Sequence, residues 1–531
     1  MNHGIISGAE SILDAGGSNN TLTNFATLNG AVIFGVGNDT VTNSGTINGV
    51  GLGFGGGTNK LTNSGAIAGD VVGGSGNDTV ENSKSIGGEV NLGDGTNTFF
   101  NSGTIGGDVI GGSSNDAAIN SGTIGGTVNF HGGNNSVINT GTITDDVGDF
   151  AGGGSGNDTV NNAGTIGDDV FLGDGTNAFL NTGTIGGRVN GGSGNDTVNN
   201  TRTMGDDVRL GDGTNTLTNS GTIALNVRGG SGIDTVTDTG IIAGIVDLLG
   251  GNDKFTGGKS VETVKDGDGA DTVKLGGNDD RYIATGNTGT DGHDTIDGGT
   301  GLNDTYDASA AIDAVFINLD TISHDFSPFL PGLFIVPANT AVGADVADAA
   351  HVLNDTITNF ENAKGGAGVD AIYGSAAANT LDSGGGGGIM FGFGGNDTLI
   401  GGAGDEGLVG GAGKDTLTSG TGADVFFYSA ITDSGVTTAT RDLITDFEDG
   451  IDKIDLANID ANTTNGVADD AFNFIGTNVA FSHVAGELRA FWTASGKIIE
   501  GDVNGDAKAD FSIELTDPTH VITLTGADFF L

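Results

Sequence analysis

The first half of the chain repeats a Gly-rich, often acidic turn about every nineteen residues. Successive turns are 19 residues apart, except for one gap of 20 and one of 23. A unit this short cannot bury its own apolar face, so the units must stack as coils of a solenoid. Stacking brings the acidic turns to one edge, where cations would relieve their mutual repulsion. The sixth positions of the turns are Asn20, Asp39, Asn59, Asp78, Asn97, Asp116, Asn135, Asp158, Asn177, Asp196, Asn215, Asp234 and Asp253.

Apolar residues recur in the same register as the turns. One column runs from Leu28 through Ile47 to Ile242, and a second runs from Val41 to Val236. Residues of high β-propensity on short segments between Gly turns predict strands rather than helices. A column of asparagines that begins at Asn24 predicts a hydrogen-bonded ladder inside a bend of each coil. We therefore expect an all-β fold whose first half is a parallel β-helix, or β-solenoid.

Composition limits the classes of partner. Lys plus Arg is 18 and Asp plus Glu is 68, so the formal charge is 18 − 68 = −50. A chain this acidic repels nucleic acid and anionic membranes, so we expect neither as a partner. Apolar residues make up 35% of the chain, enough for the narrow interior of a solenoid. Cysteine is absent. The sequence has no run of about 18 apolar residues and no N-terminal basic-then-apolar segment, so we expect no membrane span and no cleaved signal peptide.

The turns alternate between two acidic types. One type has its acid at position six, as in Gly73–Asp78, and the other at position three, as in Leu92–Asn97. Calcium accepts roughly six to eight oxygens from carboxylates and main-chain carbonyls, and glycine lets several carbonyls point inward. Where the alternation holds, adjacent coils would contribute carboxylates to a shared point. The predicted calcium ligands of the first half are Asp39, Asp78, Asp94, Asp116, Asp158, Asp174, Asp196, Asp212, Asp234 and Asp253.

The rest of the chain changes its repeat. We divide the sequence into a nineteen-residue solenoid (1–254), an irregular segment with an insertion (255–364), a nine-residue repeat (365–430) and a C-terminal cap (431–531). In the nine-residue repeat, position six falls at Asp370, Asn379, Gly388, Asp397, Glu406, Asp415 and Asp424. The acids predicted to bind calcium in these segments are Asp271, Asp294, Asp370, Asp397, Glu406, Asp415 and Asp424.

Two motifs carry a family resemblance. The unit Gly-Gly-Ala-Gly-Lys414-Asp415-Thr-Leu-Thr is similar to the Gly-Gly-x-Gly-x-Asp-x-apolar-x nonapeptide of calcium-binding RTX proteins. Residues 425–456 and the tail Asp528-Phe529-Phe530-Leu531 resemble the C-terminal domain of serralysin-type proteases and other type I secretion substrates. The first half is similar to repeats of RTX adhesins, with one turn per coil. The resemblance implies a β-solenoid followed by an RTX β-roll and a β-rich cap, and export by the type I secretion machinery without a cleaved signal.

The protease activity of that family is not expected here. It needs a zinc site of the His-Glu-x-x-His type, and none of the seven histidines has that spacing.

One further acidic loop leaves two interpretations open. The loop resembles the first nine positions of an EF-hand, but has Ala507 at position six and Ile513 at position twelve. It is either a calcium site or an acidic hairpin turn, and its candidate ligands are Asp502, Asn504, Asp506 and Asp510.

The sequence predicts an extracellular, calcium-binding structural protein that is not an enzyme. An adhesin, a matrix component and a surface-layer component are the roles we expect. Nothing in the sequence caps the first coil, so an open β-edge predicts either end-to-end self-association or an N-terminus shortened from a longer chain. Two alternatives remain. Arg281, Tyr282 and nearby acids leave open a carbohydrate-active β-helix enzyme, and a Thr column that includes Thr104 and Thr123 leaves open ice binding.

Overall fold

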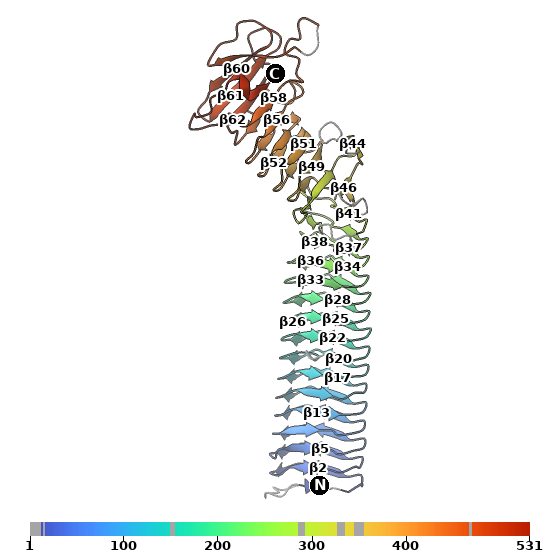
Figure 1. Ribbon diagram of the computed structural model, residues 1–531. Coiled ribbons are helices and arrows are strands. Elements are labelled where there is room, and N and C mark those ends of the chain that lie inside the picture. Colours follow the sequence, from blue (N-terminus) through green and yellow to red (C-terminus); the bar gives the residue numbers. More distant parts are fainter. Residues whose placement is uncertain are drawn as a thin grey trace. The chain divides into compact units, whose positions relative to one another are not determined.

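The computed structural model describes residues 12–13, 16–148, 154–284, 292–325, 335–344, 355–466 and 470–531. The chain forms two compact units, Met1–Ser260 and Val261–Leu531, called here the N-terminal and C-terminal units. Apart from one 3-10 turn, η1 (Gly526–Asp528), every regular element in the described residues is a strand. The prediction of an all-β solenoid is confirmed (Figure 1). The four-part division of the sequence stays a prediction.

No helix in the described residues is long and apolar enough to cross a membrane.

Coils of the N-terminal unit are built from three short strands. The four-residue strand follows the acidic turn: β2 (Thr21–Asn24), β5 (Thr40–Asn43), β8 (Lys60–Asn63), β11 (Thr79–Asn82), β14 (Thr98–Asn101), β17 (Ala117–Asn120), β20 (Ser136–Asn139), β22 (Thr159–Asn162), β25 (Ala178–Asn181), β28 (Thr197–Asn200), β31 (Thr216–Asn219) and β34 (Thr235–Asp238), with β37 (Lys254–Thr256) last. A two-residue strand comes next: β3 (Thr27–Leu28), β6 (Thr46–Ile47), β9 (Ala66–Ile67), β12 (Ser85–Ile86), β15 (Thr104–Ile105), β18 (Thr123–Ile124), β21 (Thr142–Ile143), β23 (Thr165–Ile166), β26 (Thr184–Ile185), β29 (Thr203–Met204), β32 (Thr222–Ile223) and β35 (Ile241–Ile242). The third strand leads into the next turn: β1 (Ile12–Leu13), β4 (Val32–Ile33), β7 (Gly51–Gly53), β10 (Asp70–Val72), β13 (Val90–Gly93), β16 (Val109–Gly111), β19 (Val128–Asn129), β24 (Val170–Phe171), β27 (Val189–Asn190), β30 (Val208–Arg209), β33 (Val227–Gly230) and β36 (Val246–Leu249).

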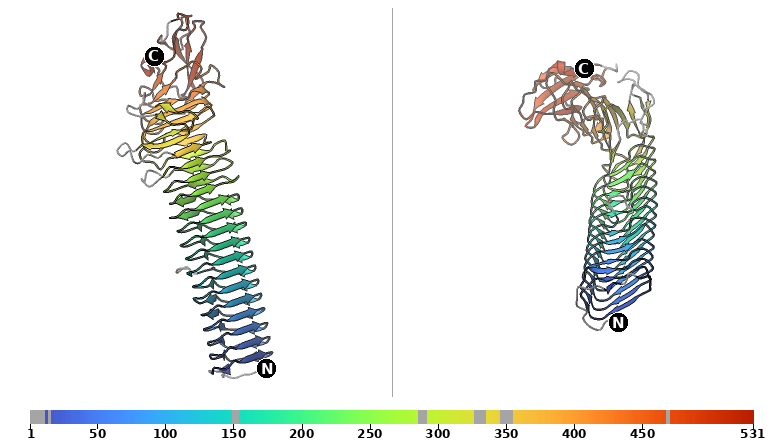
Figure 2. Two further views of the ribbon diagram at one scale, coloured as in Figure 1. Left: turned by 90° about the vertical axis from the view of Figure 1, so that its right-hand side faces the viewer. Right: turned by 60° about the horizontal axis from the view of Figure 1, so that its bottom comes forward.

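Equivalent residues of successive coils lie directly beside each other. Apart from a register shift between β13 and β16, the strands pair in parallel and in register, as in Val80 opposite Phe99 and Ile86 opposite Ile105. Both predicted apolar columns are therefore interior, and their members are almost completely buried. The two turned views in Figure 2 show the strands of this unit stacked coil upon coil.

The predicted asparagine ladder is confirmed. The Nδ2 atom of each asparagine donates to Oδ1 of the equivalent residue in the next coil, over 2.6–2.9 Å. The members are buried, and the last one, Asn219, donates to Asp238. Because every amide is buried and hydrogen-bonded, the column holds the coils together without any ion.

The coils of the C-terminal unit have strands on two sides. One sheet contains β38 (Thr263–Lys265), β40 (Arg281–Ile283), β42 (Thr305–Asp307), β48 (Asn362–Lys364), β50 (Thr380–Asp382), β52 (Thr398–Ile400), β55 (Thr416–Thr418) and β57 (Asp442–Ile444). The other contains β39 (Thr272–Lys274), β41 (Thr295–Asp297), β47 (Asp355–Thr358), β49 (Asp370–Ser375), β51 (Gly388–Gly395), β53 (Glu406–Val409), β56 (Val425–Phe427), β58 (Lys453–Asp455) and β63 (Phe529–Phe530). The short β54 (Ala412–Gly413) pairs with β51.

Two further groups of strands are added to these coils. After β42 the chain forms β43 (Ala314–Asn318) and β46 (Thr340–Ala344), which pair antiparallel, and the small pair β44 (His324–Asp325) and β45 (Ile335–Val336). The cap contains β59 (Asn473–Thr477), β60 (Glu487–Trp492), β61 (Gly496–Asp502) and β62 (Phe511–Thr516). Strands β60, β61 and β62 form an antiparallel meander, and β62 pairs in parallel with β57. The predicted open edge of the first coil involves residues 1–11, which lie outside the described residues.

Candidate metal centres

The sixth-position side chains of the N-terminal unit form a second ladder. In each coil, Oδ1 of the Asp or Asn accepts the main-chain N–H of the equivalent residue one coil earlier. Asn59 N donates to Asp78 Oδ1, for example, and Asp78 N donates to Asn97 Oδ1, both over 2.8 Å. The same bond, 2.7–3.0 Å long, joins every consecutive pair from Asn20 to Asp253. Both Asp and Asn fit this position because both supply this oxygen.

The second carboxylate oxygen has a different environment. Oδ2 of Asp39, Asp78 and Asp196 is buried and has no hydrogen-bond partner among the described residues. In the coils of Asp116 and Asp234, Oδ2 accepts one N–H, from Gly112 or Gly230, over 3.1 Å. A buried carboxylate oxygen without a donor is costly, because it has lost its hydration. A bound cation would supply the missing partner.

Burial alters the ionisation of these acids. Desolvation raises the pKa of Asp78 and of Asp234 to about 6, although hydrogen bonds from the preceding coil act in the opposite direction. Desolvation also raises the pKa values of three further sixth-position acids, Asp116, Asp158 and Asp196. The folded chain without metal therefore favours protonation at these positions.

Glycine is required at the first turn position because two oxygens crowd it. A Cβ atom on Gly73 would lie 2.5 Å from Asp78 Oδ2 and 2.2 Å from the Leu92 carbonyl oxygen. Gly191 is placed in the same way, 2.6 Å from Asp196 Oδ2 and 2.2 Å from the Leu210 carbonyl oxygen. Two oxygens of neighbouring coils therefore border one small space. Carboxylate and carbonyl oxygens are the donor set that calcium prefers, so these residues fit the predicted ion.

The third-position acids are placed differently. Asp94, Asp174 and Asp212 are exposed. Asp174 Oδ1 accepts the Ser193 hydroxyl over 2.5 Å, and Asp212 Oδ1 accepts that of Ser231 over 2.6 Å. Asp94 is close enough to Asp116 to raise its pKa, after desolvation and against several hydrogen bonds. The structure thus brings acids from adjacent coils near one another, with one buried and the other at the surface.

In the C-terminal unit the acidic ladder is doubled. On one edge, Asp397 N donates to Asp415 Oδ1 and Asp415 N to Asp442 Oδ1, both over 2.8 Å. On the other edge, Glu406 N donates to Asp424 Oδ1 over 2.9 Å and Asp424 N to Asp452 Oδ1 over 3.2 Å. The nine-residue repeat therefore alternates between two edges of an 18-residue coil.

These stacked acids are buried, and burial raises the pKa values of several of them. The buried second oxygens of Asp397, Glu406, Asp415, Asp424 and Asp442 have no hydrogen-bond partner among the described residues. Desolvation is the first cause of every shift: it raises the pKa of Asp397 and of Glu406 to about 7, of Asp415 to about 6 and of Asp442 to about 8. Asp370 departs from the pattern, because its Oδ2 accepts the Gly366 N–H over 2.6 Å.

The sequence did not identify Asp442 and Asp452 as ladder members. They stand 27 and 28 residues after Asp415 and Asp424, because the chain leaves the coil before returning to it. A signal was present, since Asp442-Leu-Ile and Asp452-Lys-Ile repeat the acid-x-apolar pattern of the nonapeptide. The irregular segment adds more members: Glu262, Asp280, Asp304 and Glu361 on one edge, and Asp355 after Asp271 and Asp294 on the other.

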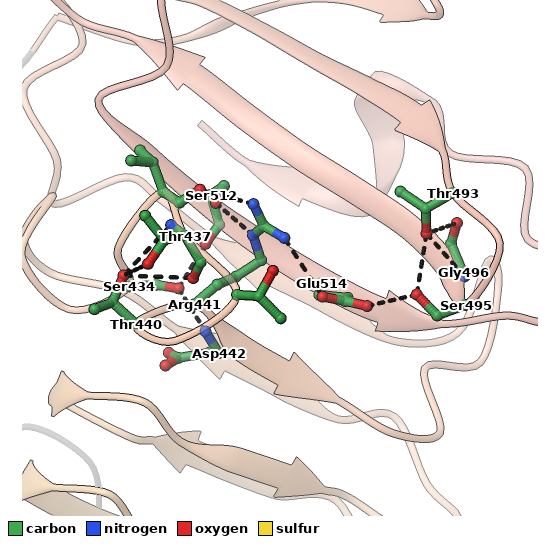
Figure 3. Close-up of polar contacts among 12 residues, drawn as sticks. Ser434, Thr437, Thr440, Arg441, Asp442, Thr493, Ser495, Gly496, Ser512 and Glu514 are labelled. Atoms are coloured by element: carbon green, nitrogen blue, oxygen red, sulfur yellow. Dashed lines mark hydrogen bonds and ion pairs between the residues drawn. The ribbon is translucent and has the colours of Figure 1, made fainter.

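Arg441 holds the returning segment in place (Figure 3). The buried guanidinium donates through Nε to Ser512 Oγ over 2.6 Å, and Nη1 lies 3.4 Å from Glu514 Oε2. Next to it, Asp442 N donates to Ser434 Oγ over 2.9 Å. These bonds attach the loop before β57 to strand β62 and position the Asp442 carboxylate on the ladder.

A buried group of three carboxylates lies inside the C-terminal unit. Oxygens of Asp266, Asp271 and Asp294 are all within 4.8 Å of one another, and all three side chains are buried. The Tyr282 hydroxyl donates to Asp266 Oδ2, and burial raises the pKa of that acid. Two of the three acids were predicted as ligands from the sequence, and Asp266 is an addition. A second group, Asp146, Asp168 and Asp169, is less buried, and Arg188 pairs with Asp169 over 2.7 Å.

The EF-hand-like loop is organised by its own hydrogen bonds. Asp502 Oδ1 accepts the N–H groups of Asn504 and Gly505, and its Oδ2 accepts that of Ala507. Asp510 accepts from Val503 N and Asn504 Nδ2, and Asp506 pairs with Lys508. The four predicted ligands are thus adjacent, and their oxygens accept hydrogen bonds within the loop.

The structure also places the residues that suggested a carbohydrate-active enzyme or an ice-binding protein. Tyr282 is fully buried, and Arg281 forms an ion pair with Asp307. The Thr column is in parallel register, and Thr104, Thr123, Thr142, Thr165, Thr184 and Thr203 are exposed. The column is broken by Ser85 and Ile241 at its two ends.

Comparisons with known proteins agree with the C-terminal assignment. Residues 341–523 match the family model described as peptidase M10 serralysin C terminal. Among solved structures, a hyperactive, Ca2+-dependent, β-helical antifreeze protein from an Antarctic bacterium is similar at 21% identity and a TM-score of 0.32, over 56% of this chain and 84% of that one. Comparison with curated proteins finds no match. The likeness to the antifreeze protein is too weak to support any argument about function. Residues 341–523 therefore match a serralysin-type C-terminal region, which agrees with the predicted RTX-type repeats.

Proposed function

We propose that the protein is a secreted structural protein whose turns bind extracellular Ca2+ and fold around it. The observation that carries the proposal is the ladder of buried carboxylates with unpartnered second oxygens, which recurs in both units. A donor is missing at each of these oxygens, and the oxygens of the neighbouring coil are close by. The ligands we propose first are the buried sixth-position acids of both units.

Calcium would supply positive charge where the carboxylates stack. A site that exists only in the folded chain converts binding free energy into folding free energy. With a formal charge of −50, the chain without calcium repels itself and stays extended. Calcium is scarce inside cells, so folding would follow export. The serralysin-type region supports export by the type I secretion machinery.

The finer role we propose is that of an adhesin, a matrix component or a surface-layer component. A long stack of coils offers a regular surface rather than one deep site, which suits contact with a partner surface or with further copies of the chain. The residues that would identify this partner are not singled out by the ladders. The third-position acids Asp94, Asp174 and Asp212, together with the 502–510 loop, are proposed as secondary ligands.

Calorimetry tests the proposal directly. The full chain is titrated with CaCl2 by isothermal calorimetry, and its melting is scanned in calcium and in EGTA, with MgCl2 as the control cation. We expect many bound calcium ions per chain and a melting temperature that rises with calcium and responds far less to magnesium, which demands a stricter octahedral geometry. An unchanged melting curve would overturn the proposal. Thermal hysteresis and assays on alginate and pectin separate the two alternatives.

A further inference from the structure

Two kinds of coil alternate through the N-terminal unit between Asn59 and Asp234. Coils with Asn at turn position six have a large apolar residue at position one, and coils with Asp at position six have glycine there. The apolar side chains are buried. The terminal coils of Asp39 and Asp253 combine an acid with Phe34 or Leu248. The alternating first positions are Phe54, Gly73, Leu92, Gly111, Phe130, Gly153, Leu172, Gly191, Leu210 and Gly229.

In the Asn coils, the side-chain amide nitrogen donates hydrogen bonds to main-chain carbonyl oxygens of its own turn. Since Oδ1 accepts the N–H of the preceding coil, Nδ2 must occupy the position that Oδ2 has in an Asp coil. Asn97 Nδ2 donates to the carbonyl oxygens of Gly93 and Gly95 over 3.0 and 2.9 Å. Asn215 Nδ2 donates in the same way to Gly211 O over 2.9 Å. The turn carbonyls of an Asn coil therefore face a donor of their own coil.

In the Asp coils, an acceptor occupies that position. Asp196 Oδ2 is buried without a partner and borders the same space as the Leu210 carbonyl oxygen. Asp78 Oδ2 repeats the arrangement beside the Leu92 carbonyl oxygen. A side chain at position one would clash with these two oxygens, so glycine is required there, whereas the Asn coils have an apolar side chain at the same turn position. Oxygens that converge without a hydrogen donor require a cation.

We propose that divalent cations occupy only every second coil of this stretch, and that the asparagine amide replaces the cation in the coils between. The cation sites are then those of Asp78 and Asp196, whose Oδ2 has no donor, and by the repeat those of Asp116, Asp158 and Asp234. Oδ2 of Asp116 and of Asp234 accepts one glycine N–H in addition. Asn97, Asn135, Asn177 and Asn215 need no cation. This inference rests on the proposed calcium binding and assigns its stoichiometry. It also explains why acid and amide alternate on a ladder where either would supply the Oδ1 acceptor.

Single isosteric exchanges test the assignment in the full chain. Asp196→Asn keeps the Oδ1 acceptor and replaces Oδ2 with an N–H donor. Asn215→Asp replaces the donor with an oxygen, in the coil between those of Asp196 and Asp234. Asp78→Asn repeats the first exchange in a second coil with the same arrangement. Asp70→Asn is the matched control, because Asp70 is exposed outside the turns and its Oδ1 accepts the Glu89 N–H. Bound calcium is counted by metal analysis after gel filtration, and the melting temperature is measured in EGTA.

We expect Asp196→Asn and Asp78→Asn each to lose one calcium ion per chain and to melt at a higher temperature in EGTA. Asn215→Asp should melt at a lower temperature in EGTA, and Asp70→Asn should change neither quantity. If the wild type binds calcium but neither Asp→Asn exchange lowers the count, the alternation is wrong and the proposed function stands. If the wild type binds no calcium, the proposed function itself is wrong.

Discussion

The two units solve the same electrostatic problem differently. In the N-terminal unit an asparagine separates the buried acids of most successive coils, and a second ladder made of amides needs no ion. In the C-terminal unit acid stacks on acid, as in Asp397, Asp415 and Asp442, and a second acidic ladder follows the other edge. The need for a cation therefore depends on how the carboxylates are spaced along the stack, and much less on their total number.

Distance sets the scale of this difference. Coils stack about 4.8 Å apart, and at an effective dielectric constant of about 20 two unit charges at that separation repel by roughly 3 kcal/mol. An intervening asparagine doubles the separation and roughly halves the repulsion. The C-terminal unit should thus depend on calcium more strongly than the N-terminal unit.

Removal of calcium should produce the largest effect. We expect EGTA to abolish most amide protection in residues 261–531 and to weaken that of residues 16–260 much less. Each site filled at 100 times its Kd contributes about 2.7 kcal/mol, and the C-terminal unit has acids on both edges. Hydrogen exchange of the full chain with and without calcium measures both units in one sample. Equal loss of protection in the two units would contradict the comparison.

A change of pH in the absence of metal should alter the stability of the C-terminal unit. In EGTA, we expect its stability to fall as the pH rises from about 4 to about 8. The folded-state pKa values of Asp397, Asp415 and Asp442, about 7, 6 and 8, lie above the ordinary value of 3.8. The folded state therefore binds more protons than the unfolded state across this window, and stability is lost as they dissociate. Melting at pH 5 and pH 8 checks the sign, and saturating calcium should remove the fall. A melting temperature in EGTA that rises with pH would be inconsistent with carboxylates that are buried without a cation.

An exchange in the amide ladder should destabilise only the N-terminal unit. Asn120→Ala removes the acceptor of Asn101 Nδ2 and the donor to Asn139 Oδ1, at 2.8 and 2.9 Å. Asn101 Nδ2 keeps its bonds to Gly103 O and Thr123 O, so the loss of two buried hydrogen bonds and of the side chain between them should cost about 1–3 kcal/mol, to the same extent in calcium and in EGTA. Thr123→Ala, at an exposed position of the next strand, is the control, with an expected change within about 0.5 kcal/mol. A loss for Asn120→Ala that appears only in EGTA would tie this ladder to the metal.

The smallest effect should come from an exposed charge pair. Lys60 Nζ lies 2.7 Å from Glu81 Oε1 on the surface of the N-terminal unit. We expect Glu81→Gln to cost about 0.2–1 kcal/mol, and less at high salt. Chemical denaturation at two salt concentrations measures it. A larger, salt-independent loss would mean that exposed charges matter here as much as the buried ladders do.

Much of the fold was predictable because the repeat is local. The spacing of Ile47 and Val41 in successive units predicted interior columns, and the column that begins at Asn24 predicted a hydrogen-bonded ladder. Most candidate ligands were found in the same way, from acids at fixed turn positions. Prediction failed where the period broke: Asp442 and Asp452 lie on the ladders although insertions of variable length separate them from Asp415 and Asp424.

The sequence by itself determined the solenoid, its register and the alternation of acid with amide, because each depends only on which residue type recurs at a fixed interval. The tertiary structure decided which oxygens are buried, which acids stay exposed at the third turn position, and that the nine-residue repeat divides its acids between two edges. Those properties arise from contacts between coils. A side chain is buried by the residues of the coils on either side of it, and they need not be its neighbours in the chain.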